Sequence, residues 1–243
     1  MHEMMSGAED EKARKQIIST GHPEIDKRIG GGLPVGSLTL VEGESDSGKS
    51  VLCQQMIWGS LNDGCKVVLF TTENTTRSLV TQMDSLGLAI LDYLLLGRVK
   101  VYYMKPSQVK IHANESFARI LESVGEHDQY QLVVVDSLTS MLPFASDVEI
   151  MHYIERCKYF CDQGRTIINV TDSYAVDTGV LIRMGSASDA HFRLLIEKIG
   201  DKLVKTLEVA KVRGAAQTTG NVITFDVEPE VGMKIMPLSR ARA

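Results

Sequence analysis

The sequence lacks the features that mark membrane, secreted or repeat proteins. No apolar run approaches the ~18 residues that a membrane-spanning helix needs. The N-terminal stretch MHEMMSGAEDEKARKQ is polar and mixed in charge, unlike a secretory signal, and no internal repeat or low-complexity block follows it. We expect a cytoplasmic protein that contacts membranes only through its partners, with a flexible leader at residues 1–18 and a single domain at 19–243.

Cysteines are few and lack the spacing of a metal site. The four of them, Cys53, Cys65, Cys157 and Cys161, include no C-x-x-C pair. Cys157 and Cys161 stand four residues apart on a predicted helix, but no His or further Cys completes a ligand set. We therefore expect buried apolar thiols in a reducing compartment.

Positive charge is also scarce, with 26 Lys and Arg against 31 Asp and Glu and a formal net charge of −5. A protein that coats nucleic acid needs a basic face. No segment combines Lys and Arg with aromatic residues that would stack on bases. We expect no nucleic-acid partner.

What the sequence has is an alternation of apolar strand-like and amphipathic helix-like segments, within a length that suits one large domain. Fully apolar strands that alternate with helices predict a mainly parallel sheet covered on both faces. The predicted strands are 37–43, 66–73, 99–104, 131–137 and 165–171. The predicted helices are 49–64, 76–86, 115–124 and 147–164, the last with Asp147 as its cap and Gly164 as its stop.

The pattern changes after about residue 190, where apolar and polar residues alternate. Residues 192–214 predict an antiparallel hairpin with a Gly-Asp turn at 200–201, and two short strands are expected at 221–227 and 233–238. The predicted fold class is therefore α/β: a mainly parallel central sheet flanked by helices, with an antiparallel C-terminal β extension.

A phosphate-loop pattern, G-x-x-x-x-G-K-[ST], lies between the first predicted strand and the first predicted helix. Its glycines let backbone N–H groups turn toward phosphate oxygens, Lys49 adds a positive charge, and Ser50 offers a hydroxyl to Mg²⁺. The pattern predicts a nucleoside triphosphate site. Its candidate binding residues are Gly43, Glu44, Ser45, Asp46, Ser47, Gly48, Lys49, Ser50 and Val51.

Two acids, Glu44 and Asp46, place negative charge inside this predicted anion-binding loop. Because the backbone of such a loop faces the ligand, we expect their side chains to point outward, where solvent screens their charge.

Two further carboxylates complete the predicted site. Asp136 ends the apolar strand LVVVD and is expected to hold Mg²⁺ together with Ser50. Glu73 ends the strand KVVLFTTE and is the candidate to orient or deprotonate an attacking water. The alternative for Glu73 is a solvated acid at the end of a strand.

Several blocks together resemble the RecA superfamily, specifically its KaiC-like branch: GGGLPVGSLTLVEGESDSGKS, FTTENT, LVVVDSLTSML and EVAKVRGAA. The resemblance covers residues 21–237, with the blocks in the same order. Within that branch the chain is similar to the short, single-domain accessory proteins of the archaellum, the archaeal swimming motor.

This resemblance implies a RecA-like P-loop fold, ATP binding with little or no hydrolysis, and assembly into a hexameric ring. It implies docking on the motor ATPase and on a cytoplasmic scaffold ring at the membrane base. It also implies that Lys211 and Arg213 reach the phosphate of a neighbouring subunit. Two cations on alternate residues of a strand end face the same way, although charges there can also protect a solvated edge strand.

The chain departs from KaiC, which carries two such domains in tandem and often two adjacent glutamates where this sequence has Glu73 and Asn74. Two alternatives to an ATP-gated assembly protein stay open. One is an autonomous KaiC-like ATPase or autokinase in signalling. The other is a RadA-like recombination ATPase, which the negative net charge disfavours. Its DNA-binding loop would fall at 184–191, where the sequence has no aromatic residue and only Arg183 nearby.

Overall fold

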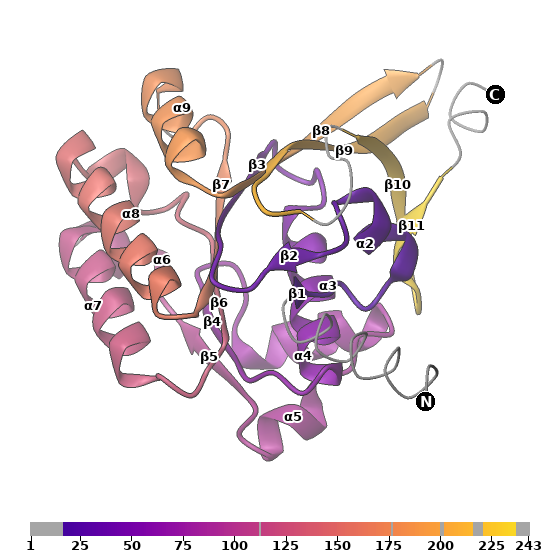
Figure 1. Ribbon diagram of the computed structural model, residues 1–243, viewed down its shortest axis with the longest axis horizontal. Helices are drawn as coiled ribbons and strands as arrows, with labels where there is room; N and C mark the ends of the chain where they lie inside the picture. Colours follow the sequence, from indigo (N-terminus) through magenta and orange to yellow (C-terminus); the bar gives the residue numbers. More distant parts are fainter. Residues whose placement is uncertain (1–16, 112, 176, 200–201, 216–220, 237–243) are drawn as a thin grey trace, which may run out of the picture.

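The structure, a computed structural model, describes residues 17–111, 113–175, 177–199, 202–215 and 221–236. Within these residues a nine-stranded sheet runs through the molecule, with helices on both of its faces (Figure 1). The strands lie in the order β11-β10-β9-β8-β3-β7-β6-β4-β5. The six strands from β8 to β5 are parallel to their neighbours, and β8 to β11 pair antiparallel. The predicted fold class is confirmed.

The parallel half of the sheet holds the apolar strands that the sequence predicted. They are β3 (Leu38–Gly43), β4 (Val67–Thr71), β5 (Val99–Tyr103), β6 (Leu132–Asp136) and β7 (Thr166–Asp172). Every residue of β3, β4 and β6 is buried. These strands show no alternation of apolar and polar residues because helices cover both sides of each.

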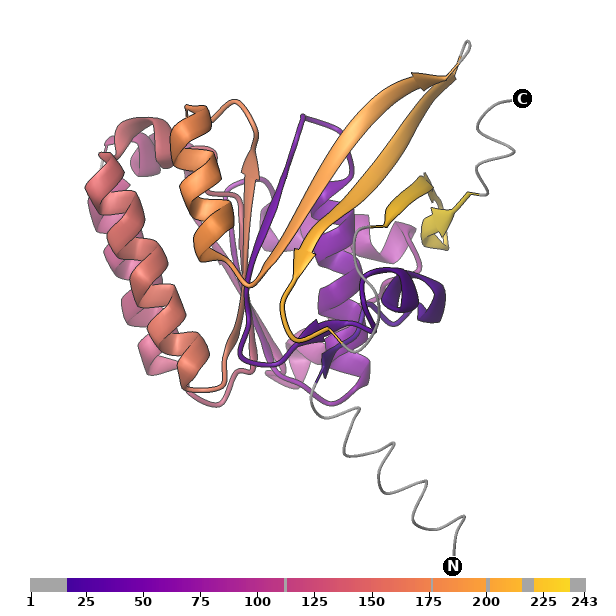
Figure 2. The same ribbon diagram turned by 45° about the horizontal axis from the view of Figure 1, so that its top comes forward.

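The helices divide between the two faces, as the edge-on view in Figure 2 shows. One face packs against α2 (Pro23–Arg28), α3 (Lys49–Asn62), α4 (Thr76–Ser85) and α5 (Leu91–Leu95). The other packs against α6 (Pro106–Ile111), α7 (Ala113–Glu126), α8 (Asp147–Asp162) and α9 (Thr178–Ala187). A short 3₁₀ turn, η1 (Leu142–Phe144), precedes α8. None of the helices in the described ranges has both the length and the apolar character to span a bilayer.

The cap predicted for α8 was off by one residue. Ser146 is the N-cap: its hydroxyl accepts from the backbone N–H of Glu149, whose carboxylate accepts from the backbone N–H of Ser146. Such a reciprocal capping box needs Ser or Thr three residues before Glu, a spacing that Asp147 does not have. Gly164 lies past the end of the helix with a φ of 91°, as a stop residue should.

The N-terminal boundary also differs from the prediction. Ile17 and Ile18, placed in the leader, form β1 (Ile17–Ile18), which pairs antiparallel with β2 (Leu33–Pro34). The buried side chain of Ile18 belongs to the core beside α3. Strand pairing of Ile17 and burial of Ile18 make these two residues part of the domain rather than of the leader. The rest of the predicted leader lies outside the described residues.

The antiparallel extension comprises β8 (Ala190–Ile199), β9 (Lys202–Val212), β10 (Val222–Glu228) and β11 (Gly232–Ile235). The β8–β9 hairpin projects from the body of the molecule (Figure 2). Its predicted turn at 200–201 lies outside the described residues, as do the last two residues of the strand predicted at 233–238. Because β8 pairs parallel with β3, the hairpin starts directly beside the strand that leads into the phosphate loop.

Two glycines let this extension pack tightly on the phosphate loop. A Cβ at Gly43 would lie 2.2 Å from the carbonyl oxygen of Leu194 on β8. Gly48 has a φ of 99°, and a Cβ there would lie 2.9 Å from the Phe225 ring on β10. Both positions therefore require glycine: Gly43 because the neighbouring strand lies too close for a side chain, and Gly48 for that reason and also for its left-handed backbone conformation.

We predict that Phe225→Ala lowers the free energy of unfolding by about 3–5 kcal/mol, because it removes a fully buried ring and leaves a cavity under the loop. Chemical denaturation measures this change. Val222→Ala on the same strand is the control, since its side chain is 53% exposed and surface changes cost within about 0.5 kcal/mol. Equal effects of the two substitutions would contradict this account of β10.

Candidate nucleotide site

The phosphate loop connects the end of β3 to the start of α3. Asp46 (φ 62°) and Gly48 (φ 99°) adopt left-handed backbone conformations that curl the chain over the first turn of the helix. The first N–H groups of α3 have no partner within the helix, and the positive end of the helix dipole lies at the same place. This end of α3 is therefore suited to bind an anion.

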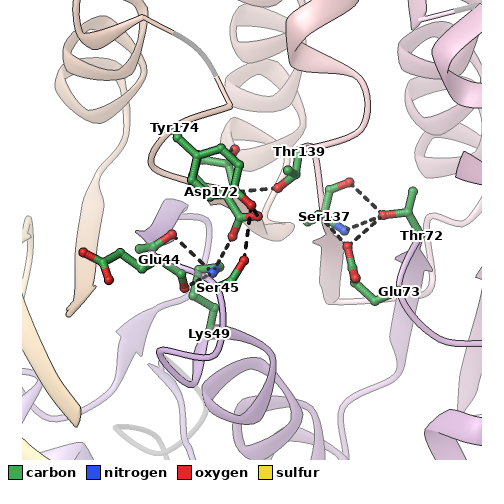
Figure 3. Close-up of polar contacts among 11 residues, drawn as sticks. Glu44, Ser45, Lys49, Thr72, Glu73, Ser137, Thr139, Asp172 and Tyr174 are labelled. Atoms are coloured by element: carbon green, nitrogen blue, oxygen red, sulfur yellow. Dashed lines mark hydrogen bonds and ion pairs between the residues drawn. The ribbon is translucent and has the colours of Figure 1, made fainter. Parts of the chain in front are cut away.

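Lys49 is buried beneath the loop, with its ammonium group fully occupied (Figure 3). It forms an ion pair with Asp172 (2.6 Å, Nζ to Oδ1) and donates to the carbonyl oxygens of Glu44 (2.6 Å) and Gly43 (3.2 Å). An ammonium has three donors, so all of them are engaged. A phosphate oxygen can bind Lys49 only by displacing one of these acceptors.

Asp172, the last residue of β7, is itself held in place. Its Oδ2 accepts from the Tyr174 hydroxyl (2.8 Å), which also lies 3.2 Å from the Ser45 hydroxyl. Its backbone N–H donates to Thr139 (2.9 Å). The carboxylate is thus fixed by its own loop at the point where it neutralises Lys49, as Figure 3 shows.

Asp136 lies at the end of β6, two strands away from β3, and is 7% exposed. Burial raises its pKa from the usual 3.8 to about 6; a hydrogen bond with Ser50 opposes the rise, and the nearby carboxylates of Glu73 and Asp172 add to it. Ser50 and Asp136, the two residues predicted to hold Mg²⁺, are therefore within hydrogen-bonding distance of each other.

A hydroxyl and a carboxylate oxygen suit Mg²⁺, which completes its shell with water and phosphate oxygens rather than with a protein cage. The described part of the chain holds no group of three or more His, Cys, Asp or Glu side chains arranged to hold a metal. Ser50 and Asp136 would hold the ion, which would neutralise charge on the phosphates.

Glu73 lies two residues past the end of β4, so the predicted strand was slightly too long. Its Oε1 accepts from Ser137 (3.1 Å) and from Thr72 (3.4 Å), and the side chain is otherwise exposed (Figure 3). The structure thus brings Glu73 to the same cleft as Lys49 and Asp136.

The side chains of the two loop acids lie at the surface. Glu44 and Asp46 are both exposed, and Figure 3 shows the Glu44 side chain directed away from the Lys49 ammonium. Asp46 lies at the rim of the cleft. Exposure allows water and salt to screen both charges.

The resulting cleft has a volume of about 310 Å³. Of the predicted residues it includes six from the loop along with Glu73 and Asp136, whereas Gly43, Glu44 and Ser47 do not line it. Its carboxylates, on Asp46, Glu73, Asp136 and Asp172, outnumber its two ammonium groups. A triphosphate would therefore bind as its magnesium complex. The lining residues are Ser45, Asp46, Gly48, Lys49, Ser50, Val51, Glu73, Gln82, Asp136, Ser137, Asp172, Lys205 and Val227.

Lys205 is a second lysine of the cleft that sequence reasoning missed. It lies on β9 and donates to the backbone carbonyl oxygen of Asp46. Within the hairpin nothing distinguishes it from other polar residues, because its proximity to the loop arises only from the pairing of β8 with β3. Asp172 was missed too, although it follows an apolar strand directly, the same signal that identified Asp136.

Lys211 and Arg213 lie apart from this cleft. Lys211 donates to the carbonyl oxygens of Gly185 (2.8 Å) and Ser186 (3.3 Å) at the end of α9, and Arg213 lies 3.5 Å from Asp189. Burial lowers the pKa of Lys211. Both cations thus sit beside the amino-terminal end of β3, roughly 16 Å along that strand from the loop.

A bulge in the β8–β9 ladder accounts for this placement. The register shifts between His191 and Phe192, so that Ala210 on β9 has no partner in the ladder. Lys205, Leu207 and Val209 face α3, but after the extra residue the alternation reverses and Lys211 faces α9. In a single chain, Lys211 and Arg213 are therefore not part of the phosphate site.

The fold and the site together define a P-loop nucleotide-binding domain of the RecA type. A family described as "ATPase: KaiC" matches residues 18–240. The chain belongs to this family.

Relatives within the family are consistent with the resemblance found from the sequence. The chain is 29% identical to "Archaeal flagellar ATP-binding protein FlaH" of Sulfolobus acidocaldarius, over 93% of this chain and all of that one. A protein of the same name from Methanocaldococcus jannaschii is 27% identical, over 90% and 94%. The crystal structure of the flagellar accessory protein FlaH from M. jannaschii superimposes with a TM-score of 0.81, at 26% identity over 91% of this chain and 99% of that one.

We predict that Asp172→Asn tightens Mg-nucleotide binding about tenfold, equivalent to about 1.4 kcal/mol, as calorimetry would measure. The substitution removes the carboxylate that competes with phosphate for Lys49 and reduces the negative charge of the cleft. The asparagine keeps the shape of the side chain and can still accept from Tyr174.

Asp128→Asn, on an exposed turn far from the loop, makes the same charge change and should leave affinity unaltered. If Asp172→Asn instead weakened binding, the carboxylate would have to assist the nucleotide, and its role as a competitor would be wrong.

Proposed function

We propose that this protein is an ATP-binding assembly component of the archaellum motor. Mg-ATP in the cleft orders a ring of copies, hexameric by the resemblance stated above, which docks on the motor ATPase and on a scaffold ring at the cytoplasmic side of the membrane base. The relatives named as archaeal flagellar ATP-binding proteins, matched over nearly their whole length, support this assignment.

The observation that carries the proposal is the state of Lys49. Its ammonium is buried and neutralised by Asp172, so the positive charge that a phosphate would bind is already paired. Because all three donors of this ammonium are engaged, a triphosphate that binds Lys49 has to displace one of its acceptors. Displacement of Asp172 would release the carboxylate on the Tyr174 loop and change the surroundings of β7, which suits a protein that responds to nucleotide occupancy.

Little or no hydrolysis fits the geometry around Glu73. Glu73, the candidate to orient or deprotonate a water, is held against Ser137 and Thr72 by two hydroxyl groups that donate to its Oε1. The neighbouring residue is Asn74, whose amide cannot act as a base. The position of Glu73 at the cleft nevertheless favours, as second candidate, an autonomous ATPase or autokinase of the KaiC kind.

Nucleic-acid binding has less support. The segment 184–191, where a RadA-like protein would have its DNA-binding loop, forms the end of α9 and the start of β8. Ser188, Ala190 and His191 there are buried, so this stretch offers no free loop.

Direct binding and turnover assays test the proposal. We predict that the protein binds Mg-ATP, that Lys49→Ala abolishes binding, and that turnover stays at least about a thousandfold below the ~10 s⁻¹ typical of enzymes. Lys105→Ala, a charge-matched change at an exposed lysine, should behave like the unmodified chain. Rapid multiple turnover that depends on Lys49 would favour the ATPase alternative, and absence of binding would overturn both.

Ring formation has its own test, in sedimentation with and without Mg-ATP. We predict that Arg213→Ala keeps the affinity for Mg-ATP but loses nucleotide-dependent assembly, since Arg213 lies outside the cleft of its own chain and is available to a neighbour. The control is Arg119→Ala, whose side chain is 79% exposed on α7. Loss of nucleotide affinity in Arg213→Ala, or unchanged assembly, would contradict this role.

A further inference from the structure

A cluster of three carboxamides lies beside the cleft, and the predicted site does not use it. Gln82 on α4 lines the cleft together with Lys49, Ser50 and Glu73. Its Oε1 accepts from Gln54 Nε2 on α3 (3.1 Å) and from Asn74 Nδ2 (3.1 Å). The cluster thus joins the helix of the phosphate loop, the residue after Glu73, and the wall of the cleft.

This arrangement fixes which end of the Gln82 carboxamide is available. A carboxamide has one acceptor oxygen and one nitrogen with two N–H donors. Because two amide groups approach the oxygen, the nitrogen remains for the cleft, and within the described residues no acceptor pairs with it. Gln82 therefore offers N–H donors to whatever fills the space beside Ser50 and Glu73.

In this orientation of the three carboxamides, one buried oxygen has no hydrogen-bond partner within the described part of the chain. Gln54 is 2% exposed, and its own Oε1 is buried without a partner among the described residues. Turning Gln54 over would satisfy that oxygen only if Gln82 and Asn74 turned as well. An unpartnered buried acceptor is uncommon in folded proteins and calls for an explanation. Here the explanation is that the same arrangement directs the Gln82 nitrogen toward the cleft.

Ser50 and Glu73 identify the part of the nucleotide that Gln82 would meet. Both also line a shallow groove that continues from the cleft along α4, and Gln82 lies at the junction of the two. If Ser50 and Asp136 hold magnesium and Glu73 orients a water, the terminal phosphate of a bound nucleotide would lie between these three residues. A neutral N–H donor there binds a phosphate oxygen and adds no charge to a site already crowded with carboxylates.

We propose that Gln82 binds the terminal phosphate and thereby makes the site prefer a nucleoside triphosphate to a diphosphate, with Asn74 and Gln54 as positioning residues. The inference rests on the proposed function, because it assumes that the cleft binds nucleotide. It also gives Asn74 a role: a glutamate at that position would present oxygens to the Gln82 oxygen and could not hold it.

The test compares the dissociation constants of Mg-ADP and of the magnesium complex of a non-hydrolysable ATP analogue. Gln82→Glu is nearly isosteric and can still accept from Gln54 and Asn74, but it presents a second carboxylate oxygen to the cleft in place of N–H donors. We expect it to weaken binding of the triphosphate analogue about thirtyfold and that of Mg-ADP less than about threefold. Gln82→Met, which removes the donors without adding charge, should lose about fivefold for the analogue alone.

Gln108→Glu, an exposed residue on α6, makes the same charge change away from the cleft and should alter neither constant. Thermal unfolding of each variant checks that the fold is retained. If Gln82→Glu bound the analogue as well as the unmodified chain does, or lost both nucleotides equally, Gln82 would not contact the terminal phosphate. Failure of the unmodified chain to bind either nucleotide would instead overturn the proposed function itself.

Discussion

The structure depends on the close contact between the phosphate loop and the antiparallel half of the sheet. The carbonyl oxygen of Leu194 and the ring of Phe225 occupy the space that side chains at positions 43 and 48 would need. The glycines that shape an anion-binding loop are therefore the same ones that let β8 and β10 pack against it. Nucleotide site and C-terminal extension form one unit, since neither can move without disturbing the other.

Charge balance is the second constraint on the site. In the arrangement described, Asp172 neutralises Lys49, and Asp136 has a pKa near 6 because it is buried close to other carboxylates. A triphosphate in these surroundings needs a cation to balance its charge, and its contact with Lys49 competes with the acceptors that the ammonium already has. The strength of nucleotide binding therefore depends on the contacts that Lys49 loses as well as on those that it gains.

The parallel sheet, the phosphate loop and Asp136 could be predicted from the sequence because each has a local signature: a buried apolar run, a glycine spacing, or an acid after a strand. Asp172 carried the same signature and was overlooked. Lys205 and Gln82 could not be predicted, because they enter the cleft through strand pairing and helix packing between segments far apart in the chain. The bulge at Ala210 could not be predicted either, because the alternation of apolar and polar residues along β9 does not reveal it. It nevertheless determines that the Lys211 side chain lies on the α9 side of the sheet. Short elements such as β1 and α9 were missed for want of periodicity.

The strand β9 contacts both the phosphate loop and the carboxyl end of α9. Lys205 touches the loop backbone near one end, and Lys211 is tied to α9 six residues further along, across the bulge. Because a strand paired on both sides hardly stretches, the separation of these two contacts along β9 is fixed by the ladder and by the register break at Ala210. β9 is thus one continuous, hydrogen-bonded link between the backbone of the phosphate loop and the carboxyl end of α9.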